Sequence, residues 1–188
     1  MESIGNINIL YSVITEIGKE KIQSDITLNI ELSRRYILMI LDRCKKIVNL
    51  GNEEYIGSFC EALLHFMLTA CTLPSDRKVR FDNIDLDIVI PSLHTLRNYP
   101  EKAIVIQIVK DSKSITGARQ KNITKIQPNA NNLWIVTREP LLGDYVNYTV
   151  ESGNNKHTTF LRRNFHDIII DIDAFLEQTK DRSLRFFH

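Results

Sequence analysis

The hydrophobic residues of this chain change their spacing at about residue 72. Before that point they recur every three or four positions, which is typical of helices that bury one face. After it they form short runs rich in isoleucine and valine, which are typical of buried strands. Helical and extended segments of these lengths pack as layers, so the pattern predicts an α/β fold with a mixed central sheet flanked by helices.

Helices are expected at both ends of the chain and strands between them. The predicted helices cover residues 7–22, 25–50, 53–71 and 114–126, with a last one through 173–177. The predicted strands cover 79–90, broken around Asn83, and then 103–110, 133–136 and 168–170, while 145–150 and 158–162 are expected to form a hairpin. We expect one compact domain, in which residues 1–50 are a helical extension, a pair of helices, and 51–188 are the α/β core.

Composition excludes several classes of function. The formal net charge is +1, so no overall field attracts nucleic acid, and a basic surface would have to be local. The three cysteines have no zinc-site spacing, and no glycine-rich phosphate loop or nucleophile motif occurs. Because no signal segment and no apolar run of about 20 residues is found, we expect a cytoplasmic protein that does not enter the membrane.

Two aspartates, Asp85 and Asp87, interrupt the apolar strand at 79–90. An ionised carboxylate that leaves water costs several kcal/mol unless a cation, a metal ion or hydrogen bonds compensate it. In a regular strand these two side chains leave the same face, while Leu86, Ile88 and Ile90 face the core. Paired carboxylates are the ligands that Mg²⁺ or Mn²⁺ prefers, and Lys110 ends the next strand. These residues are equipped for phosphodiester hydrolysis.

A third acid, Glu61, lies in the helix that is expected over residues 53–71. This helix is apolar on nearly all sides, which predicts that it is buried. Glu61 shares its face with Gly57, Leu64 and Leu68, so its carboxylate is expected to point at another packed layer rather than at water.

The order of these residues resembles the restriction-endonuclease-like, or PD-(D/E)XK, nuclease superfamily. That pattern has a helix with a glutamate, a strand with an aspartate and a strand with Glu/Gln-x-Lys, on an αβββαβ core. Here Glu61, Asp87 in Asp87–Ile90 and the segment Ile106–Lys110 stand at those places. The resemblance implies that Glu61 and Asp87 ligate Mg²⁺ or Mn²⁺, assisted by Asp85, and that Lys110 acts as catalytic base or charge stabiliser. It also implies a substrate of DNA or RNA.

The third motif departs from this pattern. Gln107 and Lys110 are three positions apart, so in a regular strand their side chains point to opposite faces. Only a β-bulge between them would bring both into one site, with Gln107 as a weak ligand. The alternative hypothesis is a catalytically inactive protein that keeps the nuclease fold as a nucleic-acid-binding or protein-assembly module.

Structural interpretations stand beside each of these assignments. The aspartates can lie at an exposed strand end or pair with Arg80 or Lys110, and Glu61 can contact His65 one turn along its helix. A third hypothesis is a structural α/β protein that forms a homodimer through its first two helices. Basic side chains that can follow a phosphate backbone, or simply be solvated, are Arg119, Lys121, Lys125, Arg162, Arg163, Lys180, Arg182 and Arg185.

Overall fold

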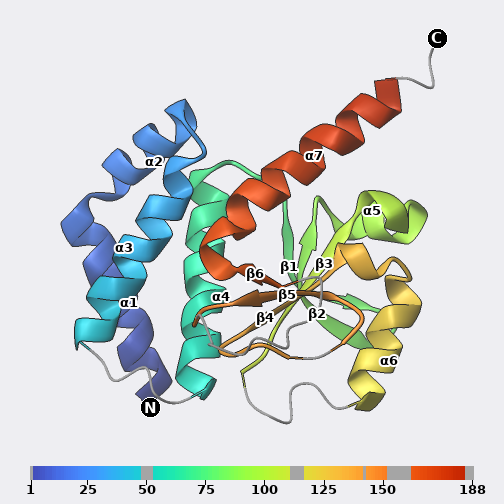
Figure 1. Ribbon diagram of the computed structural model, residues 1–188, viewed down its shortest axis with the longest axis horizontal. Helices are drawn as coiled ribbons and strands as arrows, with labels where there is room; N and C mark the ends of the chain where they lie inside the picture. Colours follow the sequence, from blue (N-terminus) through green and yellow to red (C-terminus); the bar gives the residue numbers. More distant parts are fainter. Residues whose placement is uncertain (1, 48–52, 111–116, 142, 152–161, 185–188) are drawn as a thin grey trace.

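The computed structural model describes residues 2–47, 53–110, 117–141, 143–151 and 162–184. Their helices and one mixed sheet form three layers, with the helices of the first third of the chain on one side of the sheet (Figure 1). This arrangement confirms the expected α/β class. The helices are α1 (Glu2–Ile17), α2 (Lys19–Leu28), α3 (Leu32–Ile47), α4 (Glu53–Ala70), α5 (Leu93–Asn98), α6 (Gly117–Ile126) and α7 (Ile168–Leu184).

The first part of the chain forms three helices rather than the expected pair. The first break falls at Gly18, whose φ of 98° is accessible to glycine and ends α1. The continuous apolar period across residues 7–22 hid this break, because α1 and α2 both turn buried faces toward α4. The second break, at residues 29–31, divides the helix that was expected over 25–50. Buried side chains of these three helices share one core with α4 and the sheet.

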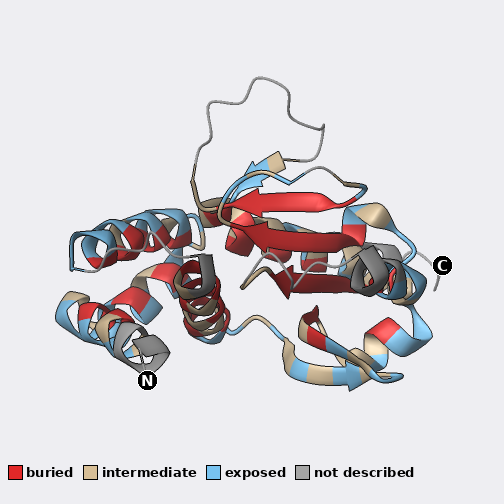
Figure 2. Ribbon diagram, turned by 90° about the horizontal axis from the view of Figure 1, so that it is seen from below, coloured by how far each residue is buried: buried red, intermediate tan, exposed pale blue. Residues whose placement is uncertain are grey.

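The sheet has six strands in the order β1-β2-β3-β4-β5-β6. The first three strands pair antiparallel, and the pairs from β3 to β6 are parallel. β3 to β5 are buried on both faces along their whole length (Figure 2). β3 and β4 are accordingly almost continuously apolar, whereas β5 also buries the polar side chains of Asn147 and Thr149. The strands are β1 (Asp76–Phe81), β2 (Ile84–Ile90), β3 (Ile104–Ile108), β4 (Leu133–Thr137), β5 (Val146–Thr149) and β6 (Arg162–Asn164).

A two-residue turn joins β1 to β2, which confirms the expected break around Asn83. Asp82 and Asn83 both have positive φ, at 44° and 69°. Such a turn matches the twist of the two strands, and Asp and Asn adopt this conformation more readily than other non-glycine residues.

Two expectations for the last third of the chain were wrong. β5 and β6 pair parallel, so they are not a hairpin. A parallel pair requires the chain to return from the end of one strand to the beginning of the next, and residues 150–161 make this connection. Most of that segment, with the expected strand at 158–161 and its turn, lies outside the described residues. Residues 168–170 are the first turn of α7 and not a strand, because Ile168, Ile169, Ile172 and Leu176 are buried at helical spacing.

The core has one cluster on each face of the sheet. The larger cluster joins α1 to α4 and α7 to one face, and the smaller one joins α5 and α6 to the other. Alternate residues along β3 and just after it contribute to the two clusters: Ile106 and Ile108 to the larger, Val105 and the following Val109 to the smaller. In the part of the chain that is described, no helix is long and apolar enough to cross a membrane.

Candidate functional site

Glu61 and Lys110 meet where α4 crosses the end of β3. The ammonium Nζ of Lys110 lies 2.6 Å from Oε2 of Glu61, and the side chain of Glu61 is only 10% exposed. On the other side of the same carboxylate, Nζ of Lys78 lies 3.4 Å from Oε1, although this contact lacks hydrogen-bond geometry. One largely buried carboxylate therefore holds two cations.

The two lysines decide the ionisation of Glu61. Burial on its own would raise the pKa of this carboxyl, because it disfavours the charged form. The hydrogen bond and charge of Lys110, followed by the charge of Lys78, outweigh burial, so the pKa lies below its usual value. Glu61 is therefore an anion at neutral pH.

Gly57 explains how α4 comes close enough to β3 for this contact. It lies one helical turn before Glu61. A Cβ atom at this position would be 2.6 Å from the carbonyl oxygen of Val109 and 2.7 Å from Cα of Lys110. Because only glycine fits there, the backbone that carries Lys110 can rest directly against the helix.

Asp87 lies where β2 and β3 part. The paired residues of these strands end at Ile88 and Ile106, and the Oδ2 atom of Asp87 accepts a hydrogen bond of 2.8 Å from the backbone N–H of Ile108. The carboxylate thus satisfies a β3 backbone donor beyond the ladder. Since Ile108 comes two residues before Lys110, Asp87 is fixed to the same strand end that presents Lys110 to Glu61.

Lys78 of β1 lies opposite Asp87 of β2. The pairs Arg77 with Ile88 and Val79 with Leu86 flank these two residues. Its φ of 48° interrupts the regular pleat. On β2, Leu86 packs in the smaller core cluster while Ile88 packs in the larger. The expectation that Leu86 and Ile88 face the same core was therefore wrong. The regular alternation of side chains between the two faces of the sheet is interrupted between these residues.

Asp87 lies on β2, between β1 and β3, and each of these two neighbours supplies a lysine that contacts Glu61. Lys78 of β1 and Lys110 at the end of β3 both contact that carboxylate, at 3.4 and 2.6 Å. The structure thus joins Lys110 and Lys78 to Glu61, and ties Asp87 to the strand end that carries Lys110.

Asp85 does not join this group. Its side chain is 82% exposed, and Oδ1 lies 3.7 Å from Nε of Arg80, the residue directly across the hairpin. This is the pairing that the structural interpretation of the aspartates predicted. The change of face at Asp87 separates the environments of the two acids, which strict alternation would have kept together.

Gln107 is not brought to Lys110 either. The pairing of β3 with β4 advances one residue at a time from Val105 to Ile108, so no bulge lies within these positions. Gln107 therefore shares the face of Val105 and Val109, whereas Lys110 lies on the face of α4. Its side chain is buried, at 4% exposure.

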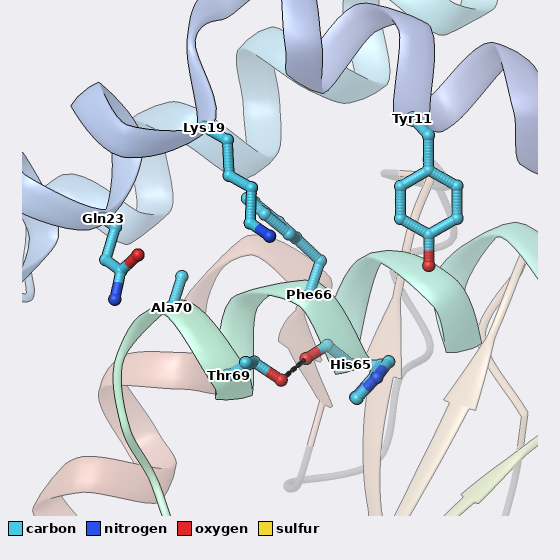
Figure 3. A pocket seen from close by; sticks show the side chains of 7 residues that line it. All are labelled: Tyr11, Lys19, Gln23, His65, Phe66, Thr69 and Ala70. Atoms are coloured by element: carbon cyan, nitrogen blue, oxygen red, sulfur yellow. Dashed lines mark hydrogen bonds between the residues drawn. The ribbon is translucent and has the colours of Figure 1, made fainter.

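His65 occupies the next turn of α4 after Glu61. Burial lowers the pKa of its imidazole, and the charge of Arg77 on β1 adds to this effect, while the charge of Glu61 opposes it. The Nδ1 atom of His65 is buried without a hydrogen-bond partner. The ring also lines a hollow between α1, α2 and α4, together with Lys19 and Thr69 (Figure 3).

The donor set suits a hard divalent cation. Among the described residues no three acidic, histidine or cysteine side chains lie close enough together to hold a metal ion. Mg²⁺, however, is commonly held by one or two carboxylates together with water and substrate phosphate. Oε1 of Glu61 is buried without a hydrogen bond, which is the condition of an oxygen that can still accept a ligand. Glu61 and Asp87 therefore fit such a set.

Most of the basic side chains noted in the sequence have structural partners where they are described. Arg163 lies 2.9 Å from Asp171, and Lys180 lies 2.7 Å from Glu177. Arg162 contacts the backbone oxygen of Glu151 at 3.5 Å, and Lys125 is exposed on α6. The side chains of Arg119, Lys121, Arg182 and Arg185 lie outside the described residues.

Sequence reasoning missed Gly57 and Lys78. A glycine inside a buried helix, one turn before a buried acid, is a detectable signal, since glycine destabilises helices without a compensating contact. Lys78 gave no such signal, because a lysine in the sequence does not indicate a left-handed backbone conformation.

Comparison with solved structures finds restriction endonucleases whose fold is similar to that of this chain. One is the restriction endonuclease PspGI in a substrate DNA complex, with 16% sequence identity, a TM-score of 0.60 and coverage of 92% of this chain and 93% of that one. Another is metal-depleted Ecl18kI in complex with uncleaved, modified DNA, with 11% identity, a TM-score of 0.59 and coverage of 92% and 78%. No protein-family model and no curated protein matches the sequence.

Proposed function

Because this chain has the restriction-endonuclease-like fold, we propose that it hydrolyses phosphodiester bonds of nucleic acid with a divalent cation, Mg²⁺ or Mn²⁺. The observation that carries the proposal is the ion pair of Glu61 and Lys110 beside Asp87 at the parting of β2 and β3. DNA is the substrate that we place first, since the solved structures with this fold are DNA complexes. Fold alone does not fix function, so the proposal rests on this site.

Asp87 and Glu61 are the residues that would hold the cation. When bound, a divalent cation supplies positive charge to the phosphate and makes water a stronger nucleophile. Asp87 is held in place by the N–H of Ile108 and Glu61 by Lys110, so neither carboxylate has to be ordered at the moment of binding. Asp85 is left out of this set because it pairs with Arg80 in solvent.

Lys110 would act on the phosphate as a fixed positive charge. In hydrolysis a water oxygen forms a bond to phosphorus, the bond to the leaving oxygen breaks, and negative charge grows on the phosphoryl oxygens. An ammonium that is held by Glu61 has no lone pair to accept the proton of the attacking water, which passes to solvent instead. Lys110 therefore stabilises charge in the transition state.

The direct test incubates the purified protein with labelled duplex DNA, single-stranded DNA and RNA, each with Mg²⁺, with Mn²⁺ and with chelator. We expect cleavage of DNA that requires the divalent cation and stops when it is chelated. Cleavage that continues in chelator would contradict the proposal. Salt-sensitive binding of DNA without any cleavage would instead support the alternative, a binding module that has lost catalysis.

A further inference from the structure

Lys78 has a backbone conformation that its place in the fold does not require. Of the four described non-glycine residues with positive φ, Thr72 follows the end of α4, and Asp82 and Asn83 form the hairpin turn. Lys78 alone among them lies inside a strand, with a φ of 48°. A long side chain in this region is uncommon, and strain of this kind is concentrated at functional sites.

The side chain of Lys78 is the more exposed of the two cations beside Glu61. It is 69% exposed, whereas the side chain of Lys110 is 35% exposed and that of Glu61 is 10% exposed. Both lysines contact the same carboxylate, but Lys110 does so at 2.6 Å and Lys78 at 3.4 Å without hydrogen-bond geometry. Lys110 is the inner cation of the pair, and Lys78 is the outer one.

From this difference we infer that Lys78 binds a backbone phosphate of the nucleic acid, next to the phosphate that is cleaved. The inference rests on the proposed function, since it assigns a substrate contact to the same site. A loosely held, solvated ion pair contributes little free energy, so the ammonium can leave Glu61 for a phosphate oxygen at little cost. Lysine is suited to this role, because it binds phosphate as a compact charge on a flexible stem.

The left-handed backbone has a role in this account. At Lys78 and Asp87 the strand pair changes face, and the lysine points toward Glu61 on the α4 side. Arg77 pairs with Ile88 of the larger cluster, whereas Val79 packs in the smaller one, so regular alternation along β1 is interrupted at Lys78. At this interruption the side chain of Lys78 brings a second cation to Glu61.

The test measures binding of a short labelled duplex by fluorescence anisotropy in metal-free buffer, at salt concentrations from about 50 to 200 mM. The variants are Lys78→Gln, Lys78→Arg and Lys78→Gly. Lys46→Gln is the matched control, because Lys46 is 72% exposed and also pairs with an acid, Asp42, one turn before it on α3.

We expect Lys78→Gln to weaken binding about three- to tenfold and to lower the slope of log affinity against log salt by about one, the signature of one lost phosphate contact. Lys78→Arg should retain most of the affinity, and Lys46→Gln should match the wild type. Lys78→Gly should bind as weakly as Lys78→Gln. Its melting temperature should be higher than that of Lys78→Gln, because glycine adopts positive φ without strain.

Two failures are distinguishable. If the wild-type protein binds DNA and Lys78→Gln has the same affinity and salt slope, the role of Lys78 is overturned while the proposed function stands. If the wild-type protein binds neither DNA nor RNA, the proposed function fails, and the role of Lys78 fails with it.

Discussion

Lys110 and Glu61 form an ion pair of 2.6 Å between the end of a central strand and the middle of the helix that covers it. The pair ties the strand that contains Gln107 to the helix that contains Gly57. It also fixes a positive charge at the strand end to which Asp87 is tied, because the carboxylate of Asp87 accepts a hydrogen bond from the backbone two residues before Lys110. The site therefore depends on the packing of α4 on β3 as much as on its charged groups.

Gly57→Ala is expected to disrupt this packing. In an ordinary helix the change stabilises by up to about 1 kcal/mol, because alanine is the better helix former. Here the added Cβ meets backbone atoms at 2.6 and 2.7 Å, so we expect destabilisation of about 1–3 kcal/mol and loss of cleavage. Urea unfolding measures the effect, with Ser58→Ala as control. A Gly57→Ala protein that is more stable than the wild type would contradict the close approach.

Substitutions of Asp87 separate its structural role from its proposed catalytic role. Asp87→Ala removes the acceptor of the Ile108 N–H, so we expect the free energy of unfolding to fall by about 1–3 kcal/mol. Asp87→Asn keeps a side-chain oxygen and should lose much less stability, while both variants lose the carboxylate. Urea unfolding of the two proteins tests this. Equal destabilisation by both would show that the hydrogen bond depends on the charge.

Because of Glu61, we expect the free energy of unfolding to depend on pH in the acidic range. Burial opposes its ionisation, but the hydrogen bond and charge of Lys110 and the charge of Lys78 hold its pKa below the usual 4.5. A carboxyl whose pKa is lower in the folded state stabilises the fold above its unfolded value and loses that contribution as the pH falls through the folded value. Glu61→Gln should therefore cost about 1–3 kcal/mol at pH 7.

The difference between wild type and Glu61→Gln should shrink as the pH falls below about 4.5. Unfolding free energies measured across this range check it. Glu177→Gln, which removes an exposed glutamate from its pair with Lys180, is the control and should change stability by less than about 1 kcal/mol. A constant cost of Glu61→Gln at all pH values would exclude the ion pair as its cause.

Because of His65, we expect the free energy of unfolding to depend on pH in a second range, nearer to neutral pH. Burial lowers the pKa of its imidazole and the charge of Arg77 adds to this, so the folded state binds the proton less well than the unfolded state. The stability that this gives is present above the usual value of 6.5 and is lost as the pH falls below it. His65→Gln should flatten this part of the stability curve, whereas His94→Gln, at an exposed position of α5, should leave it unchanged.

The order of Glu61, Asp87 and Lys110 along the chain could be predicted because each marks a conflict between charge and burial. An acid in an apolar helix and an acid in an apolar strand both require a partner, and a lysine after a buried strand supplies one. The structure places all three in one region and confirms the restriction-endonuclease-like fold. The assignment of catalytic and metal-binding roles to them stays a prediction, as do the domain boundary at residue 50, the homodimer and the cytoplasmic location.

What the sequence did not predict depends on backbone geometry. Asp85 and Asp87 differ in environment because the strand pair changes face at Lys78, and no residue spacing encodes that change. The run Ile168–Ile170 fits a strand as well as a helix, and only its packing in the larger core cluster selects the helix. Both errors come from applying a regular period where tertiary packing decides.

The most direct test of the account is the rate of divalent-dependent DNA cleavage by Asp87→Asn beside Asp85→Asn. The two variants make the same chemical change two residues apart, on a carboxylate bonded to β3 and on one that is paired with Arg80 in solvent. We predict that Asp87→Asn lowers the rate at least about 100-fold, because it removes a carboxylate that would hold the cation, and that Asp85→Asn stays within about threefold of the wild type. Cleavage by Asp87→Asn at the wild-type rate would contradict the account.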